Sequence, residues 1–154
     1  MLKVNSIDDL KKNTEHYEEV FQLFNEARSY ILTFDWCKSI QNTWLAYECG
    51  YIIGIFLLEV ETTGKMTDND MFWVIVGDIP PFCVNKKDVQ TAYEALSKYI
   101  LTMEEWIFKV YNNEDTTFCY SISVPNTVKF ADMLNTRVKL LKEDFLEAVN
   151  DFSV

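Results

Sequence analysis

The residues of this sequence that could do chemistry are carboxylates, aromatic side chains, one histidine and a few cysteines. Four side chains lie in or beside apolar, strand-like segments and are the candidates for binding a ligand or a partner: Glu48, Asp70, Trp73 and Asp78. Acid–base catalysis needs two carboxyl groups in different environments. A carboxylate-lined pocket near Asp78, in an enzyme or a small-molecule binder, is therefore one hypothesis.

Nucleophilic catalysis has little support in the sequence. His16 is the only histidine, and a Cys–His or Ser–His–Asp site would have to use it. It falls in the expected first turn of a helix, where a surface residue is the ordinary interpretation. No nucleophile motif accompanies it. We therefore expect no catalytic residue, and a protein that is not an enzyme is favoured.

Motifs for phosphate, metal and cofactor binding are missing. The chain has four glycines and neither of the common phosphate-loop patterns. Asp68-Asn69-Asp70 is similar to the opening of a calcium loop, but Trp73 and Ile79 stand where such a loop has glycine and glutamate. No C-x-x-C pair occurs among the four cysteines, Cys37, Cys49, Cys83 and Cys119. We expect reduced thiols, no metal and no cofactor.

The charge balance selects among classes of partner. The formal net charge is −10, so binding to nucleic acid or to anionic lipid would need a local basic patch. The basic clusters Lys11-Lys12, Lys86-Lys87 and Arg137–Lys142 all have carboxylates beside them. We therefore expect a protein partner of basic charge, no nucleic acid and no membrane, with a homodimer as an open alternative.

Length and hydropathy indicate one domain, residues 1–154, with one core. Met1–Lys12 carries charges throughout and lacks the apolar region of a signal peptide. The longest apolar run, Tyr51–Leu58, is far shorter than the roughly 20 residues of a membrane helix. These features predict a cytoplasmic protein.

The segment from Trp44 to Pro81 contains three strand-like runs, Trp44–Cys49, Tyr51–Val60 and Met71–Val76. Their connections are short, which favours antiparallel pairing. The middle run is apolar at consecutive positions, so both of its faces should be buried and it should be central in the sheet. After the third run, Gly77–Pro81 has the composition of a constrained turn, in which glycine permits a positive φ and the prolines end the strand.

Helical periodicity predicts three main helices and one short helical turn. Ser6 and Asp9 form a capping pattern for the short turn Ile7–Lys11. The main helices are expected from Asn13 or Thr14 to Leu32, from an N-cap at Asp88 to about Asn112, and from Pro125 or Asn126 to Phe152. Residues 118–124 are either an edge strand or an extended connector. The predicted fold class is α+β, a three- to four-stranded antiparallel meander packed with three main helices, in the order α-β-β-β-α-(β)-α.

Three segments carry a resemblance to known sequences. They are the run WVIVGDIP from Trp73 to Pro80, the M-x-x-W pattern within Tyr99–Trp106, and the A-x-M-L pattern of Ala131–Leu134. They resemble a family of small uncharacterised bacterial proteins with a W-V-x-V-G-D-[LI]-P run, a domain of unknown function. The resemblance covers most of the chain, and it implies a bacterial source and a shared architecture but no activity.

The favoured functional hypothesis is a non-enzymatic protein-interaction factor that binds a basic partner. Short acidic proteins of this kind include bacterial immunity and accessory proteins, and that association guides the hypothesis. A secretion-chaperone-like acidic protein is an alternative, because such chaperones are also small, acidic and α+β. The enzyme or small-molecule binder with a pocket near Asp78 is the other alternative.

Overall fold

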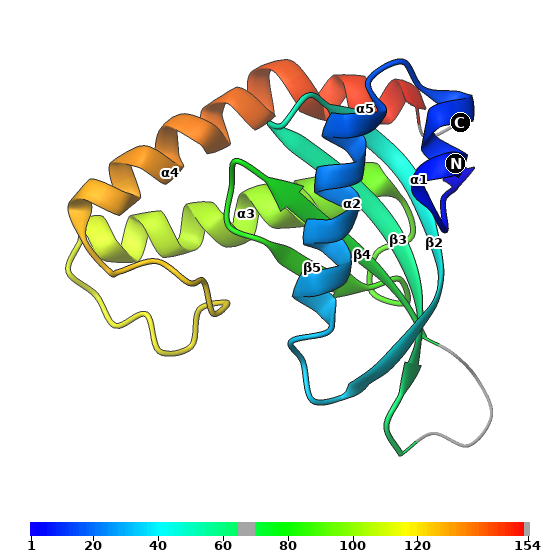
Figure 1. Ribbon diagram of the computed structural model, residues 1–154. Helices are drawn as coiled ribbons and strands as arrows, with labels where there is room; N and C mark the ends of the chain where they lie inside the picture. Colours follow the sequence, from blue (N-terminus) through cyan, green and yellow to red (C-terminus); the bar gives the residue numbers. More distant parts are fainter. Residues whose placement is uncertain (65–69, 153–154) are drawn as a thin grey trace. The chain divides into compact units, whose positions relative to one another are not determined.

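The computed structural model describes residues 1–64 and 70–152 (Figure 1). The chain divides into two compact units, residues 1–92 and residues 93–154. The first unit holds a five-stranded antiparallel sheet and two helices. The second holds nearly all of a long helix and the helical segments that follow it. The class is thus α+β, as predicted, whereas one domain over 1–154 stays a prediction.

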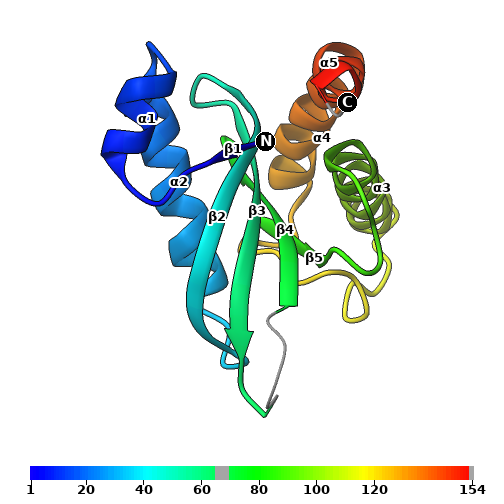
Figure 2. The ribbon, with the colours of Figure 1, turned by 90° about the vertical axis from the view of Figure 1, so that its right-hand side faces the viewer.

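The strands follow one another across the sheet in chain order, and each neighbouring pair is antiparallel. They are β1 (Leu2–Lys3), β2 (Cys37–Cys49), β3 (Ile53–Thr62), β4 (Asp70–Gly77) and β5 (Phe82–Asn85). Figure 2 shows β2, β3 and β4 side by side. The prediction that the middle run is the central strand is confirmed, with bounds shifted from Tyr51–Val60 to Ile53–Thr62.

The predicted number of strands was too low, because polar or very short strands escape an apolar pattern. β1 has two residues and β5 four, too few to show an alternation. β2 begins at Cys37 rather than Trp44, because its polar first half also pairs with β3, and side-chain hydrogen bonds accompany this backbone pairing. Ser39 Oγ lies 3.1 Å from Glu61 Oε2, and Asn42 Nδ2 donates to Glu59 Oε2 at 2.6 Å.

Two helices belong to the first unit, α1 (Ile7–Asn13) and α2 (Tyr17–Ile31). The predicted capping box of α1 is confirmed: Ser6 Oγ accepts from the Asp9 amide, and the Asp9 carboxylate accepts from the Ser6 amide. The second predicted helix was too long at its start, because the Thr14 side chain accepts from the His16 amide and holds a turn there.

One face of α2 packs on one face of the sheet. The buried residues of this core come from both elements, and they include Val20, Leu23, Phe24, Ala27, Ile31, Phe56, Leu58, Val60, Val74 and Val76. On β3 the alternate residues Ile53, Ile55 and Leu57 are buried as well. β3 is therefore buried on both faces, as its unbroken apolar sequence predicts.

The second unit is helical. It contains α3 (Ala92–Tyr111), and then one continuous rod made of α4 (Val128–Leu140), the π-helical turn η1 (Leu141–Phe145) and α5 (Leu146–Phe152). Two side-chain contacts tie α3 to the rod in antiparallel orientation. Tyr111 Oη donates to Asp132 Oδ1 at 2.6 Å, and Lys142 Nζ lies 3.2 Å from Glu104 Oε2.

Two predicted helix starts were wrong, and of the two alternatives for residues 118–124 the extended connector is the one observed. The amides of Asp88 and Val89 donate to the Asn85 carbonyl, so a turn occupies the predicted N-cap, and α3 begins at Ala92. The last helix begins at Val128, where the hydroxyl of Thr127 caps it. Residues 118–124 form a connector without strand pairing, and Phe118 is 93% exposed.

The end of β4 touches the turn between β2 and β3. Gly77 has a φ of +136°, and a Cβ there would lie 2.2 Å from the carbonyl oxygen of Ile52. The amide of the next residue, Asp78, donates to the same oxygen at 3.1 Å. The prediction that Gly77 needs a conformation unfavourable for other residues is therefore confirmed.

Replacing Gly77 with alanine should lower the free energy of unfolding by about 2–4 kcal/mol, since strain in φ and a backbone clash act together. Gly50→Ala is the matched control, because Gly50 also has a positive φ of +53° but its Cβ would meet Glu19 Oε2 at an ordinary 3.7 Å. It should cost about 1 kcal/mol. Urea unfolding measures both, and equal losses would contradict a clash at Gly77.

Candidate functional site

The four candidate residues do not form one site. Asp70 begins β4 and Asp78 follows its last residue, so they lie about 25 Å apart at a rise of roughly 3.3 Å per residue. Trp73 is in the interior of the same strand. Glu48 is opposite Gly54, which in turn pairs with Val76, so it lies at the Asp78 end of the sheet.

Asp70 and Trp73 have internal partners that explain their presence. Asp70 is buried, and its Oδ1 lies 3.2 Å from Lys87 Nζ across the β4–β5 hairpin. A cavity of about 250 Å³ is lined by Asp70, Met71, Asn85, Lys86, Lys87 and Gln90. The buried indole of Trp73 donates from Nε1 to the Val89 carbonyl at 3.1 Å. Both residues therefore brace the segment that follows β5.

The other end of the sheet exposes apolar side chains in a turn. Gly50 to Ile52 connect β2 to β3, and within this turn Tyr51 is 49% and Ile52 39% exposed. Asp78 is exposed and bonded through its amide to Ile52. An apolar pair and a carboxylate thus lie side by side at this end.

Glu48 brings further negative charge to the same end. Its carboxyl is half-buried and faces the first turn of α2, where Glu19 lies close to Gly50. Burial raises the pKa of Glu48 above its ordinary value, and the charge of Glu19 raises this pKa further. The charge of His16 and a hydrogen bond from the Gly50 amide act in the opposite direction.

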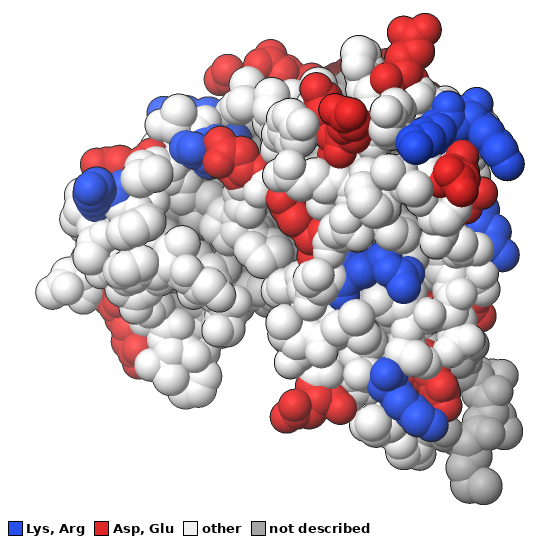
Figure 3. Space-filling view, viewed as in Figure 1, with Lys and Arg blue, Asp and Glu red and all other residues white. Residues whose placement is uncertain are grey.

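We call this group the turn-end surface: Glu19, Glu48, Tyr51, Ile52 and Asp78. Figure 3 shows acidic side chains around the start of α2, in the upper part of the view. The sequence indicated Glu48 and Asp78 but placed Tyr51 and Ile52 inside a buried strand. The available signal for a turn in the sequence was Gly50, which stands three residues before the first buried residue of β3. In the structure Gly50 has a positive φ.

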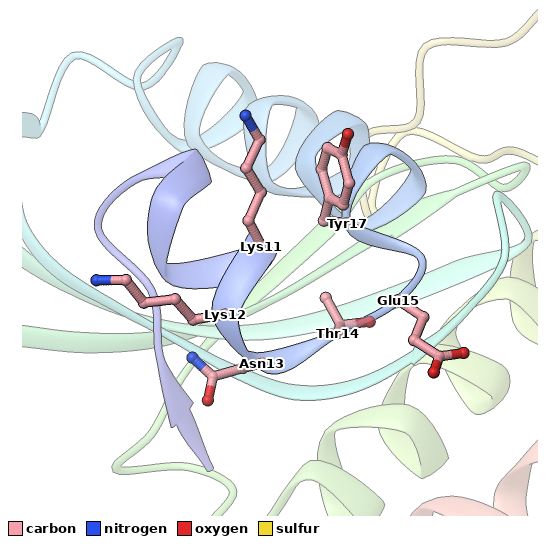
Figure 4. A pocket seen from close by; sticks show the side chains of 6 residues that line it. All are labelled: Lys11, Lys12, Asn13, Thr14, Glu15 and Tyr17. Carbon is pink, nitrogen blue, oxygen red and sulfur yellow. The ribbon is translucent and has the colours of Figure 1, made fainter.

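A cavity of about 530 Å³ lies between α1 and α2, and it is lined by Lys11, Lys12, Asn13, Thr14, Glu15 and Tyr17. In Figure 4 the side chains that line it diverge. Lys11 lies beside Tyr17, with Nζ 5.4 Å from the ring centroid, while Lys12 and Glu15 point in opposite directions. Ligand sites bring polar groups together, so this hollow lacks the geometry of one.

Neither a cluster of metal-ligating side chains nor a membrane-spanning helix occurs in the described part of the chain. Among residues 1–64 and 70–152 no group of three or more His, Cys, Asp and Glu is arranged to hold a metal ion. No described helix is both long and apolar enough to cross a bilayer. The four cysteines all lie in the described ranges and form no disulfide.

Comparison with known proteins identifies a family but no characterised relative. A family model described as a domain of unknown function, DUF4826, matches residues 14–147. The chain therefore belongs to this family, whose match includes the turn-end surface and all three segments of the predicted resemblance. Neither a curated protein nor a solved structure matches the chain significantly.

Glu48→Gln should change the dependence of stability on pH. A carboxyl with a raised pKa binds its proton more tightly in the folded state, so its ionisation destabilises the protein as pH rises above the ordinary glutamate value. The variant should therefore melt at a higher temperature than the parent at neutral pH, and this difference should disappear on acidification.

Glu61→Gln provides a control of opposite sign. Hydrogen bonds from Lys38 and Ser39 lower the pKa of Glu61, so its charged form stabilises the folded state and this contribution is lost as pH falls. Melting curves between acidic and neutral pH measure both variants. If the melting temperature of Glu48→Gln varied with pH in parallel with that of the parent, ionisation of Glu48 would not destabilise the folded state.

Proposed function

We propose that this member of the DUF4826 family is a non-enzymatic interaction factor that binds a basic protein partner through the turn-end surface. Its biological role would be that of a bacterial immunity or accessory protein. The proposal is supported by one observation above all: two large apolar side chains are exposed in a turn whose backbone lies close to Glu19 and to Asp78.

The apolar part of this surface has no role in the turn itself. Glycine, asparagine, aspartate and serine are the residues that turns favour, and they would close the β2–β3 connection without exposing apolar area. Tyr51 and Ile52 are instead half-exposed. Tyrosine is among the residues that contribute most at protein interfaces, because its ring buries a large area with little loss of side-chain entropy.

The charged part of the surface favours a basic partner. Glu19 and Glu48 lie close together beside the turn, Asp78 follows the strand that ends against it, and among the described residues His16 is the basic side chain that acts on Glu48. Carboxylates on the rim attract a positively charged protein at long range and orient its approach. They contribute more to the association rate and to specificity than to the final affinity.

Acid–base chemistry on a small molecule is a second candidate function. It is favoured by the raised pKa of Glu48 next to Glu19, because two carboxyl groups in unlike environments can act as acid and base. Glu48→Gln distinguishes the two candidates. It would abolish catalysis, whereas it would leave binding through Tyr51 and Ile52 largely intact.

The double variant Tyr51→Ser, Ile52→Ser should weaken partner binding by about tenfold to a hundredfold, since it removes the apolar centre of the interface. The partner is first captured with the immobilised protein, identified and purified, and the dissociation constant is then measured by calorimetry. Leu101→Ser, Phe108→Ser is the matched control, because these side chains are 67% and 59% exposed on α3. If the double variant and the parent bound the partner with equal affinity, the turn-end surface would be excluded as the binding site.

Asp78→Asn should slow association without changing the melting temperature, because it removes a charge from an exposed position and keeps the shape. The rate for the parent should fall as salt screens the charges, and the variant should show a smaller fall. Asp88→Asn is the control, since Asp88 is exposed in the turn after β5, toward the opposite end of β4. Stopped-flow rates that do not depend on salt would contradict a basic partner.

A further inference from the structure

The charges of the helical rod Val128–Phe152 are segregated along its length. The first part contains the basic residues Lys129, Arg137, Lys139 and Lys142. The last part contains the acidic residues Glu143, Asp144, Glu147 and Asp151 and no basic residue. Asp132 is the one acid in the first part, and it accepts a hydrogen bond from Tyr111 of α3.

This order of charges opposes the stability of the helix. The N-terminal end of a helix favours negative charge and the C-terminal end favours positive charge, each interaction being worth about 0.3–1 kcal/mol. The rod has the reverse arrangement. Within the described residues, Lys129, Asp144, Glu147 and Asp151 form no ion pair that would compensate. These four charges are therefore available to a partner outside this chain.

The rod also exposes apolar side chains on the stripe that carries these charges. Met133 is 43% and Leu140 36% exposed, and they are seven residues apart, two helical turns on one face. Lys129, Arg137 and Asp144 lie at spacings of three and four residues from them. Along the stripe, bases and apolar residues alternate in the order Lys129, Met133, Arg137 and Leu140, and the acids Asp144 and Asp151 follow.

We propose that a second copy of this chain packs on this stripe in antiparallel orientation, around a twofold axis near Leu140. The basic part of each rod then lies on the acidic part of the other, with Lys129 close to Asp151 of the second copy. Arg137 lies close to Glu143 and Asp144 of the second copy. Leu140 of each copy forms the apolar centre at the axis, Met133 packs beside the aliphatic part of Glu147 of the second copy, and the rods overlap over about 37 Å.

A second copy fits this stripe better than any partner with one sign of charge. A basic protein would be repelled by the first part of the rod, and an acidic protein by the last part. A twofold axis turns the same surface onto itself, so a stripe that is positive at one end and negative at the other is self-complementary. Parallel packing is excluded, because it would place like charges together along the whole length.

Two charge-reversal variants of the full chain test the dimer. Lys129→Glu, Arg137→Glu replaces the two bases of the stripe with acids, and Asp144→Lys, Asp151→Lys replaces acids at its other end with bases. Each should weaken self-association by more than about tenfold, because attractive pairs become repulsive. Mixed in equal amounts, they should form a heterodimer, since each acidic stripe now meets a basic one.

Analytical ultracentrifugation measures the masses at low and high salt, and melting curves check the fold. Both reversals act in the direction that the helix dipole favours, so neither should lower the melting temperature through the helix. The parent should dimerise at low salt and dissociate as salt rises. Tyr51→Ser, Ile52→Ser is the matched control and should dimerise like the parent, because it leaves the rod unchanged.

Three results would overturn the proposal. The first is a parent protein that stays monomeric at low salt and high concentration. The second is a dimer that both reversals leave unchanged. The third is a mixture of the two variants that does not associate. None of these results depends on the turn-end surface, so a failed dimer and a failed partner interaction remain distinguishable.

Discussion

The contact between the backbone of Gly77 and the carbonyl of Ile52 determines where the turn-end surface lies. A side chain at position 77 would come within 2.2 Å of that oxygen, so the strand end and the turn can meet only through glycine. The same oxygen accepts the amide of Asp78. The backbone of Asp78 is therefore held beside Ile52 by backbone geometry.

A second close approach places the acidic residues of α2. Gly54 lies on β3 under the helix, where a Cβ would meet atoms of Leu23 at 3.1 and 3.2 Å. Its lack of a side chain lets α2 approach the sheet, and one turn earlier Glu19 comes close to Gly50 and Glu48. This packing contributes to the raised pKa of Glu48: burial is the largest cause, and the negative charge of Glu19 on the helix adds to it. The position of the turn-end surface thus depends on close approaches at two glycines, Gly77 and Gly54.

The features that the sequence predicted correctly are those in which local chemistry and tertiary structure agree. β3 has an unbroken apolar sequence and is buried on both faces, Ser6 and Asp9 form the capping box, and Gly77 has the positive φ. β1 and the polar half of β2 were missed, because their pairing depends on neighbouring strands rather than on an apolar pattern.

Two residues of the turn-end surface, Glu48 and Asp78, were candidates in the sequence, whereas Tyr51 and Ile52 were not. Glu48 and Asp78 could be chosen because carboxylates stand out beside apolar runs. Tyr51 and Ile52 look like strand interior in the sequence, and only the turn at Gly50 makes them exposed. Asp70 and Trp73 were also candidates for the site. In the structure Asp70 forms an ion pair with Lys87, and the indole of Trp73 donates to the Val89 carbonyl. A single sequence does not contain the positions of such distant partners.

The charged residues of the chain are arranged in a more specific way than solubility alone requires. Solubility depends on net charge and on the absence of large apolar patches, so carboxylates scattered over the surface would be sufficient. The turn-end surface instead combines carboxylates with exposed apolar residues, and the rod separates its bases from its acids against the helix dipole. Each arrangement costs stability or solubility, and a complementary surface of the kind proposed would compensate this cost. The complements differ, because an acidic rim matches a basic protein whereas a stripe with opposite charges at its two ends matches its own copy.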